Sequence, residues 1–526
     1  MFIAIGCCLL AIGVEAAPPL RGLVPMKVGN RTMVAAADVP RTYAEGDYCA
    51  SHAMIGNGSY LPHTGSPRVL TILAAFQDVA FTINDPVKAF EQYLNGDKQE
   101  DLGNSNQYNM ASVRQYFETC SHEQFSPQFD IVGPLTLPQK MAYYGGKDAT
   151  GKDDKFSDFC RDAMGLAKEV VEDWSVYDND KDGKVELVCV IFAGFGQNQG
   201  GADSTIWAKA SLQNLKLNET LSISRFNCSP ELFYPKYPDM INGTGVFIHE
   251  FSHCMGLPDL YATTSKAYVN NQGMETYSIM DYGLYNRNSF APAPYTAWEQ
   301  EVLGWTTMED AKSLMVDETC QIDGVLPLIE GGKAYKLVNP DNDRDYIVME
   351  NVQKRGLNLY GDGHGLLVYH VDYPKGSVNM GDTPNNNPGH PAVAVVPAGG
   401  MLISCYLRGD GKPYTGDEWQ ESLASSTFPG PKEVTSLTAK MQLPNNCFYD
   451  ADTVLPTGFM LSDIVEDAES GGVSFMISPD NTTGVKEVRW QKDDATGPIY
   501  DLQGRKIQGR LKSGIYIAHG KKILVK

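Results

Sequence analysis

The sequence predicts an α+β domain followed by an all-β, sandwich-like domain. Its 526 residues are enough for two or more domains. Between residues 67 and 310, apolar strand-like runs alternate with stretches of helical spacing, which is typical of an α/β arrangement. Between 311 and 477, short alternating segments are separated by Gly, Asn, Asp and Pro, which is typical of antiparallel sheets.

The first domain is expected to begin with a buried strand at residues 68–76, because this run is short and almost wholly apolar. Amphipathic spacing predicts helices at 86–94 and 110–119. The remaining elements expected in this domain, in chain order, are a strand at 129–137, a helix at 155–174, a strand at 186–194, a helix at 246–255 and a helix at 293–303.

The second domain contains strand-like runs at 346–350 and 365–371. His370 and Asp372 would share one face of a strand, and half-buried polar packing explains the pair more simply than a site does. Residues 478–497 are expected to form a polar linker. Residues 498–526 resemble the C-terminal sorting tail of exported Bacteroidetes proteins, which implies recognition by secretion machinery; a simple hairpin cap is the alternative.

Composition restricts the classes of partner. Apolar residues make up 42% of the chain and charged residues 20%, which suits packed cores and argues against disorder. The net charge of −21 argues against nucleic acid, because phosphates would be repelled. Of the eleven cysteines, Cys7 and Cys8 lie in the apolar N-terminal run and nine follow it. Nine is an odd number, so at least one of these thiols cannot be in a disulfide within the chain. A Cys228–Cys254 disulfide and burial of both thiols as apolar groups are both open.

The N-terminus predicts export. Residues 1–14 are apolar and precede Glu15-Ala16-Ala17, which indicates a signal peptide over 1–16. Residues 17–66 are rich in Pro, Gly, Asn and Ala and are expected to form a pro-segment or an N-terminal extension. No run is long and apolar enough to predict a transmembrane segment. We therefore expect a secreted or cell-surface protein.

The helix expected at 246–255 carries the sequence His249-Glu250-Phe251-Ser252-His253. Histidines four residues apart lie on one face of a helix and can bind one Zn²⁺. Glu250 would then lie beside the metal, placed to take a proton from a water bound there.

The third metal ligand is expected in the turn after this helix. Gly256 and Pro258 end the helix, and the turn can bring Asp259 back to the two histidines. Three protein ligands leave one coordination position open, as a catalytic zinc requires. In a gluzincin arrangement, Glu275 or Glu299 would be the third ligand instead of Asp259.

Downstream motifs point to a family. The run Ser278-Ile-Met-Asp-Tyr-Gly283 resembles the Met-turn of the metzincin peptidases, which implies that Met280 supports the zinc site and Tyr282 stabilises the oxyanion. The clan's commonest third ligand is His, so Asp259 is a departure. The runs 256–261, 177–183, 295–299 and 370–373 resemble the immune inhibitor A family of secreted metallopeptidases, in its Bacteroidetes-type branch. The resemblance implies a metzincin-like catalytic domain at 67–310.

Further predictions concern calcium and the cleft. Asp178, Asp180 and Asp182 alternate before a glycine, a spacing that can surround a structural Ca²⁺; a solvated acidic turn is the alternative. The strand at 186–193 is a candidate edge strand for pairing with extended substrate. The glycine-rich loop 194–201 is expected to be flexible beside the cleft. Trp207 could line the cleft or belong to the core.

The function predicted from these motifs is zinc-dependent hydrolysis of peptide bonds in proteins or peptides. Glu250 is the expected general base, and zinc would polarise the scissile carbonyl. The alternative is a catalytically degenerate secreted or surface protein that uses its β domain to recognise glycan or protein.

Overall fold

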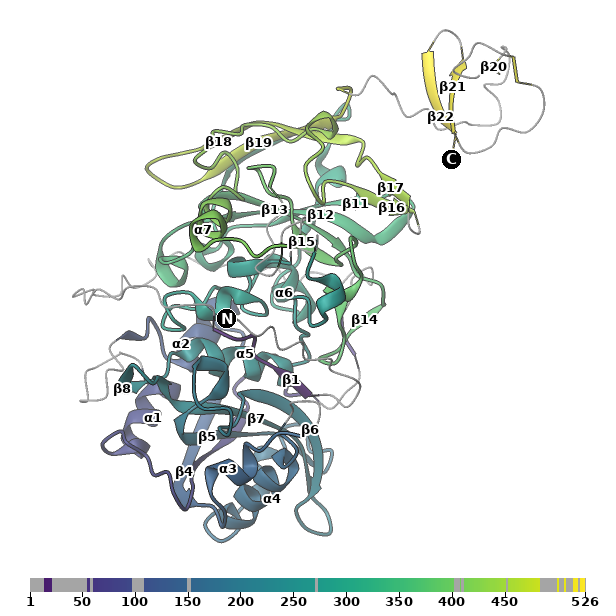
Figure 1. Ribbon diagram of the computed structural model, residues 1–526. Helices are drawn as coiled ribbons and strands as arrows, with labels where there is room; N and C mark the ends of the chain where they lie inside the picture. The colour runs from purple at the N-terminus through teal and green to yellow at the C-terminus, as the bar shows by residue number, and fades with distance from the viewer. Residues whose placement is uncertain are drawn as a thin grey trace.

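The computed structural model describes most of the chain. The described residues are 14–20, 54–56, 60–96, 108–148, 153–269, 273–401, 407, 411–450, 453–482, 499–500, 506–507, 514–518 and 521–525. Helices and strands are mixed throughout them, in agreement with the α+β class (Figure 1). No helix in these ranges is long and apolar enough to cross a membrane.

A seven-stranded sheet organises the first half of the molecule, in the order β1-β6-β7-β5-β3-β4 with β8 paired to β7. Strands β4, β3, β5 and β7 are parallel to one another, whereas β6 and β8 are antiparallel to β7, and β1 is antiparallel to β6. Their bounds are β1 Val14–Ala16, β3 Arg68–Ala75, β4 Gln128–Thr136, β5 Lys184–Phe195, β6 Lys209–Lys216, β7 Ser222–Tyr234 and β8 Tyr237–Ile241.

The position of β5 corrects one prediction. The strand at 186–193 was expected at the rim, but β5 lies between β3 and β7 in the interior of the sheet. Its residues from Val185 to Gly194 are buried on both faces, as the unbroken apolar run requires in a parallel sheet. At this end of the sheet, β6 pairs with β7 on one side and with the three-residue strand β1 on the other, so β1 is the edge strand.

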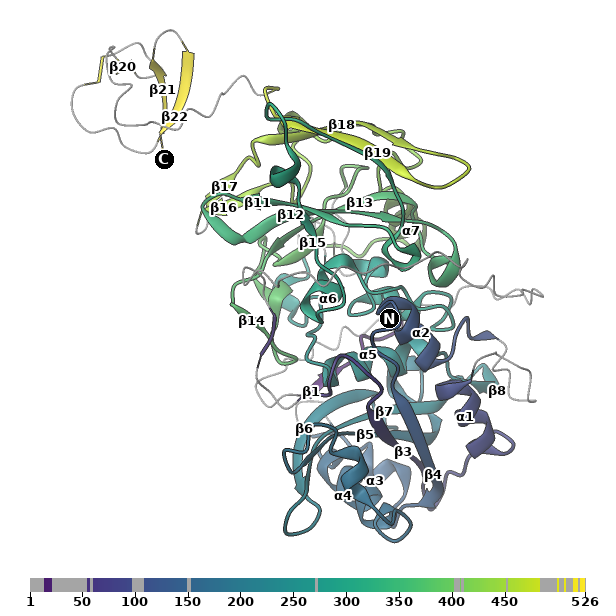
Figure 2. The same cartoon turned by 180° about the vertical axis from the view of Figure 1, so that it is seen from behind.

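Helices cover both faces of this sheet. Alternate residues of β3 and β5 face opposite ways: Leu73 and Ile191 pack in the core that includes α5, and Ile72 and Val190 pack in the core that includes α4. Figures 1 and 2 show α3 and α4 on the side of the sheet away from α5. The helices are α1 Pro86–Asn95, α2 Val113–Cys120, α3 Met141–Tyr144, α4 Phe156–Ala167, α5 Thr244–Cys254, α6 Ala297–Val302 and α7 Gly416–Ala424.

Two helices are shorter than the sequence predicts. The helix expected at 155–174 ends at Ala167, before Val170 and Val171, whose branched side chains weaken helix formation. The helix expected at 293–303 is only α6, because Thr296 caps its N-terminus and the prolines lie before this cap.

The second half contains two larger sheets. One runs β15-β13-β12-β11-β9 and the other β10-β19-β18. Helix α7 lies among these strands, so the region is not all-β, and a sandwich-like domain stays a prediction. The bounds are β9 Glu309–Asp310, β10 Cys320–Val325, β11 Tyr335–Asn339, β12 Asn342–Val352, β13 Gly365–Asp372, β15 Val393–Val395, β18 Phe459–Glu466 and β19 Val473–Pro479.

The five-stranded sheet is buried on both faces. Ile347 and Val368 pack with Phe475 of the smaller sheet. Val348 and Tyr369, on the opposite face, belong to the same core as helix α5. Packing is therefore continuous across the boundary expected at residue 310, and the proposed domain limits stay predictions.

Small sheets complete the described chain. They are β2 Met54–Ile55 with β14 Ser377–Val378, β16 Phe448–Asp450 with β17 Thr453–Leu455, and β20 Ile499–Tyr500 with β21 Gly514–Ala518 and β22 Lys521–Val525. Of the expected signal peptide, only Val14–Ala16 is described, and most of the expected linker at 478–497 lies outside the described residues.

The described cysteines form no disulfide. Seven are free and buried, so the Cys228–Cys254 bridge is wrong and the alternative, two buried thiols, holds. Burial raises the pKa of Cys254 to about 12, which keeps this thiol protonated and unreactive. Cys49 and Cys405 lie outside the described residues.

Candidate metal centre

Helix α5 carries the His-Glu-x-x-His sequence through the interior. Every residue of this helix is buried, and the rings of His249 and His253 lie on one face with centroids 4.7 Å apart. The helix ends at Cys254, and the chain turns at Gly256, where φ is +106°, a conformation that favours glycine. A Cβ at this position would also lie 2.6 Å from Cγ2 of Ile55, so the turn needs glycine for space as well.

The turn returns the chain to the helix. The backbone N–H of Leu260 donates to the carbonyl of Met280 (2.8 Å), which fixes the segment that carries Asp259. The carboxylate oxygen Oδ1 of Asp259 lies 3.3 Å from Nε2 of both His249 and His253. The structure therefore brings the three expected metal ligands together in a buried group.

Backbone carbonyls orient both imidazoles. Nδ1 of His249 lies 2.8 Å from the carbonyl oxygen of Ile279, and Nδ1 of His253 lies 2.8 Å from that of Leu257. A carbonyl only accepts hydrogen bonds, so each Nδ1 carries the proton, and each Nε2 keeps its lone pair directed at Asp259. Such a contact on the far side of the ring is typical of metal-binding histidines.

The donor atoms fit a metal ion. Nε2 of both histidines and both carboxylate oxygens of Asp259 are buried without a hydrogen-bond partner in the described part of the chain, and so is Oε2 of Glu250. Leaving so many buried polar atoms unpaired would be costly. A divalent cation held by two imidazoles and a carboxylate satisfies them, and this ligand set suits zinc.

Burial and charge shift the pKa values of this group. Burial lowers the pKa of His249 and raises that of Glu250 to about 8. Burial acts against the charged form of His253, but the neighbouring Asp259 outweighs it and raises the pKa of His253. Burial would likewise raise the pKa of Asp259, but the two histidines hold it below its usual range.

The Met-turn lies beneath the helix. Met280 is fully buried, and its backbone N–H donates to the hydroxyl of Ser278 at 2.9 Å. Tyr282 is also buried, and its ring packs against the rings of Tyr261 and Trp419. A third tyrosine, Tyr285, was not singled out from the sequence; its hydroxyl donates to the carbonyl of Pro18.

Neither alternative ligand joins the group. Glu299 is the capping-box residue of α6: its carboxylate accepts hydrogen bonds from the N–H and hydroxyl of Thr296 and from Ser278. The carboxylate of Glu275 accepts a hydrogen bond from the indole of Trp419 at 3.2 Å. The gluzincin arrangement is therefore wrong for these two residues.

The acidic turn differs from its prediction. The structure groups the carboxylates of Asp178 and Asp180 with that of Glu186, within 4.8 Å of one another. The carboxylate of Asp182 pairs instead with Lys184 at 2.9 Å. Glu186 belongs to β5 rather than to the acidic turn, so the spacing of the turn alone does not indicate it. Calcium binding stays a prediction.

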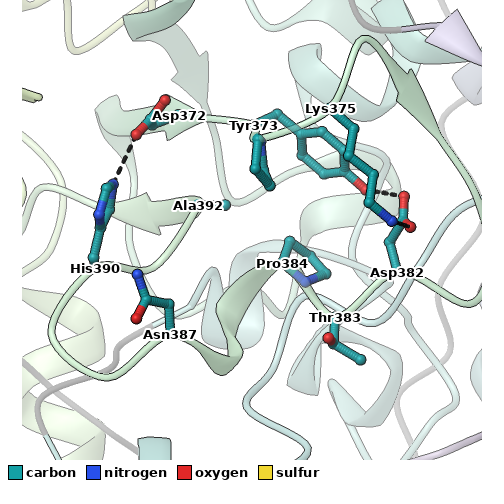
Figure 3. Close-up of a pocket in the computed structure, with 10 residues that line it drawn as sticks. Asp372, Tyr373, Lys375, Asp382, Thr383, Pro384, Asn387, His390 and Ala392 are labelled. Carbon is teal, nitrogen blue, oxygen red and sulfur yellow. Dashed lines mark hydrogen bonds and ion pairs between the residues drawn. The ribbon is translucent and has the colours of Figure 1, made fainter. Parts of the chain in front are cut away.

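A hollow of about 250 Å³ lies away from the metal ligands, lined by residues around the end of β13 (Figure 3). In it, His390 pairs with Asp372 at 2.7 Å, and Tyr373 donates to Asp382 at 2.7 Å. His370, on the same strand, is buried and pairs with Asp345 at 2.7 Å. His370 and Asp372 thus have separate partners, as expected for polar packing.

Comparison with known proteins shows which family the region around α5 resembles. Residues 63–303 match the family model described as immune inhibitor A peptidase M6, catalytic domain. The chain is 26% identical over 220 residues to "Immune inhibitor A" of Bacillus thuringiensis subsp. alesti, covering 37% of this chain and 31% of that protein. It is 25% identical over 275 residues to "Pre-pro-metalloprotease PrtV" of Vibrio cholerae serotype O1 (strain M66-2), covering 45% of this chain and 29% of that protein. The chain thus spans about a third of the length of these relatives.

Proposed function

Because residues 63–303 belong to the immune inhibitor A family of M6 peptidases, we propose that the chain is a zinc-dependent endopeptidase that acts on proteins. The observation that carries this proposal is the convergence of unpaired, buried donor atoms of His249, His253 and Asp259 beside the carboxylate of Glu250. A structural metal site would use four protein ligands, whereas this group offers three.

Zinc held by these three residues would supply Lewis acidity toward the scissile carbonyl and the attacking water. Glu250 would take the proton of that water and pass it to the leaving nitrogen. Its buried carboxyl group, with a pKa near 8 before metal binds, can hold a proton in the interior. Tyr282 would donate to the developing oxyanion, and Met280 and Gly256 would support the ligands.

Segments outside the candidate metal centre add export and a calcium site to the proposal. The apolar N-terminus supports export to the cell surface or the medium, and the tail at 498–526 supports recognition by secretion machinery of the Bacteroidetes type. A calcium ion bound by Asp178 and Asp180, with Glu186, would stabilise the entry into β5. The degenerate-scaffold alternative has less support, because the donor atoms of the metal ligands are intact and converge.

The experiment measures metal content and casein cleavage on the same purified protein. We expect one zinc per chain, and cleavage that a chelator abolishes and added zinc restores. Glu250→Gln should keep the zinc and lose cleavage by about 1,000-fold or more, because it removes the proton carrier. Glu91→Gln, an exposed carboxyl group of α1 outside the ligand set, is the control for the same substitution. A zinc-free protein, or a zinc-loaded Glu250→Gln variant that cleaves casein at the native rate, would contradict the proposal.

A further inference from the structure

The segment Ala17–Leu20, with strand β1 before it, contacts the candidate general base. Ala17 is 1% exposed, and its backbone N–H donates to Oε1 of Glu250 at 2.7 Å. Strand β1 pairs antiparallel with β6, with Ala16 opposite Lys209 and Val14 opposite Ser211. Figure 1 shows β1 beside β6, close to α5.

Three backbone contacts hold the residues that follow. The indole N–H of Trp207 donates to the carbonyl of Ala17 at 2.7 Å, and the hydroxyl of Tyr285 donates to the carbonyl of Pro18. The backbone N–H of Leu20 donates to the carbonyl of Asn198 at 2.9 Å. All these contacts involve backbone atoms of the segment, so they do not depend on its side chains.

The contact with Glu250 shows which peptide bond of the segment lies at the position of the reacting bond. In the proposed reaction, the carboxyl group of Glu250 gives its proton to the nitrogen of the peptide bond that breaks. The nitrogen in contact with it is that of Ala17, so the Ala16–Ala17 bond lies where a substrate's reacting bond would lie. The residues before this bond add a strand to the sheet edge, which is a general way to bind extended peptides.

Resting on the proposed function, we propose that residues 14–20 occupy the substrate cleft as a peptide substrate does. Trp207 and Tyr285 are then positioning residues that bind the carbonyls of the first and second substrate residues after the cleaved bond. The edge of β6 binds the residues before it. This assignment gives a role to Trp207, which is only half-buried, and to the loop that carries Asn198.

Trp207 and Tyr285 can be tested without zinc or turnover. In the full chain, produced without export so that residues 14–20 remain, backbone hydrogen exchange is measured in the presence of a chelator. We expect slow exchange at Ala17 and along β1. Trp207→Phe and Tyr285→Phe each remove one donor and should speed exchange of the segment roughly two- to tenfold.

Matched variants separate this effect from general loosening. Trp174→Phe removes an indole N–H that meets no acceptor in the described part of the chain, and Tyr143→Phe removes a hydroxyl bonded to Asp158. Both should leave exchange of residues 14–20 unchanged. Fast exchange of Ala17 in the native chain, or equal exchange in the native and Trp207→Phe proteins, would overturn the assignment.

A second measurement tests binding of a separate peptide. Ala17→Pro in the full chain removes the N–H that contacts Glu250 and should release the segment. A labelled peptide with the sequence of residues 14–20 should then bind at least about tenfold more tightly than to the native chain, because the tethered competitor is gone. Adding Trp207→Phe should weaken this binding. Equal binding to the native chain and to Ala17→Pro would refute occupancy of the cleft.

These readouts are independent of the proposed peptidase activity. Protection of Ala17 that depends on Trp207, in a protein that neither binds zinc nor cleaves casein, would support the occupied cleft and refute the proposed reaction. Zinc-dependent cleavage with unprotected residues 14–20 would support the reaction and refute the occupied cleft.

Discussion

Replacing Glu299 by Gln should make the protein more stable above neutral pH. Glu299 is fully buried, and burial raises its pKa from 4.5 to about 7, even though its carboxylate accepts hydrogen bonds from Ser278 and Thr296. The folded protein therefore binds this proton more tightly than the unfolded chain does. The stability that this group contributes is fully present below pH 4.5 and is lost as the pH rises through 7.

The size of the effect follows from the same values. A rise in pKa from 4.5 to about 7 corresponds to about 3 kcal/mol of folding free energy between the two ends of this pH range. Gln is neutral at every pH and can serve at the third position of a capping box. The variant should therefore match the native protein near pH 4.5 and exceed it by up to about 3 kcal/mol at pH 8.

Thermal unfolding from pH 4.5 to 8, at constant zinc content, measures the difference. For a cooperative unit of the size of residues 63–303, about 3 kcal/mol corresponds to roughly 6–12 °C in Tm. Glu91→Gln, at an exposed position in α1, reports the effect of the same substitution on the surface. A Glu299→Gln variant that is less stable than the native protein at pH 8, or whose difference does not change with pH, would refute the reasoning. Loss of zinc from this variant would restore Glu299 as a candidate ligand.

Three further outcomes are expected. Asp259→Asn keeps the shape of the side chain but removes its charge, so zinc affinity in a competition titration should fall about 100-fold or more with little change in far-UV circular dichroism; unchanged affinity would exclude Asp259 as a ligand. Gly256→Ala should cost about 2 kcal/mol in thermal melts, because φ is +106° and Ile55 lies in the way, whereas Gly165→Ala, in an open part of α4, should cost nothing. Tyr282→Phe should lower kcat about tenfold or more with little change in KM, and a change confined to KM would contradict its role at the oxyanion.

The sequence predicted the parts of the site that depend on local spacing. His249 and His253 are one helical turn apart, and Asp259 follows a turn that Gly256 and Pro258 require, so few conformations of this stretch are available. The first parallel strand, α1 and α2 were also predicted, because each is a short element with a clear apolar pattern.

The predictions are wrong or incomplete where contacts between segments far apart in the sequence determine the structure. The apolar run of β5 indicates a strand covered on both faces, but only the strand order shows that β5 lies between β3 and β7 and that β1 and β6 lie at the end of the sheet. Glu186 joins Asp178 because β5 begins beside the acidic turn, a contact that loop spacing alone does not reveal. The contacts of Trp207 and Tyr285 with residues 17 and 18 join positions more than 180 residues apart in the chain, so no local pattern predicts them.

The second half of the chain supports the elements that carry the candidate metal ligands. Strands β12 and β13 hold the start of α6, since Glu350 accepts from the N–H of Ala297 at 3.1 Å, and the hydroxyl of Tyr369 accepts from the N–H of Trp298 at 3.0 Å. The same helix places Glu299 against the Met-turn, whose backbone orients His249.

The contacts therefore run without interruption from the five-stranded sheet to His249, a proposed metal ligand. Ser278 donates to Glu299 at 2.5 Å and accepts from the N–H of Met280, and the carbonyl of Ile279 between them holds Nδ1 of His249. One face of that sheet packs in the core that includes α5, and the other face packs in a separate core. Because both faces are packed, the sheet is a rigid support for α6. A chain that ends near residue 310 would lose Val348 and Tyr369 from the core that includes α5, together with the hydrogen-bond partners of α6. The histidines would then lose part of what fixes their orientation.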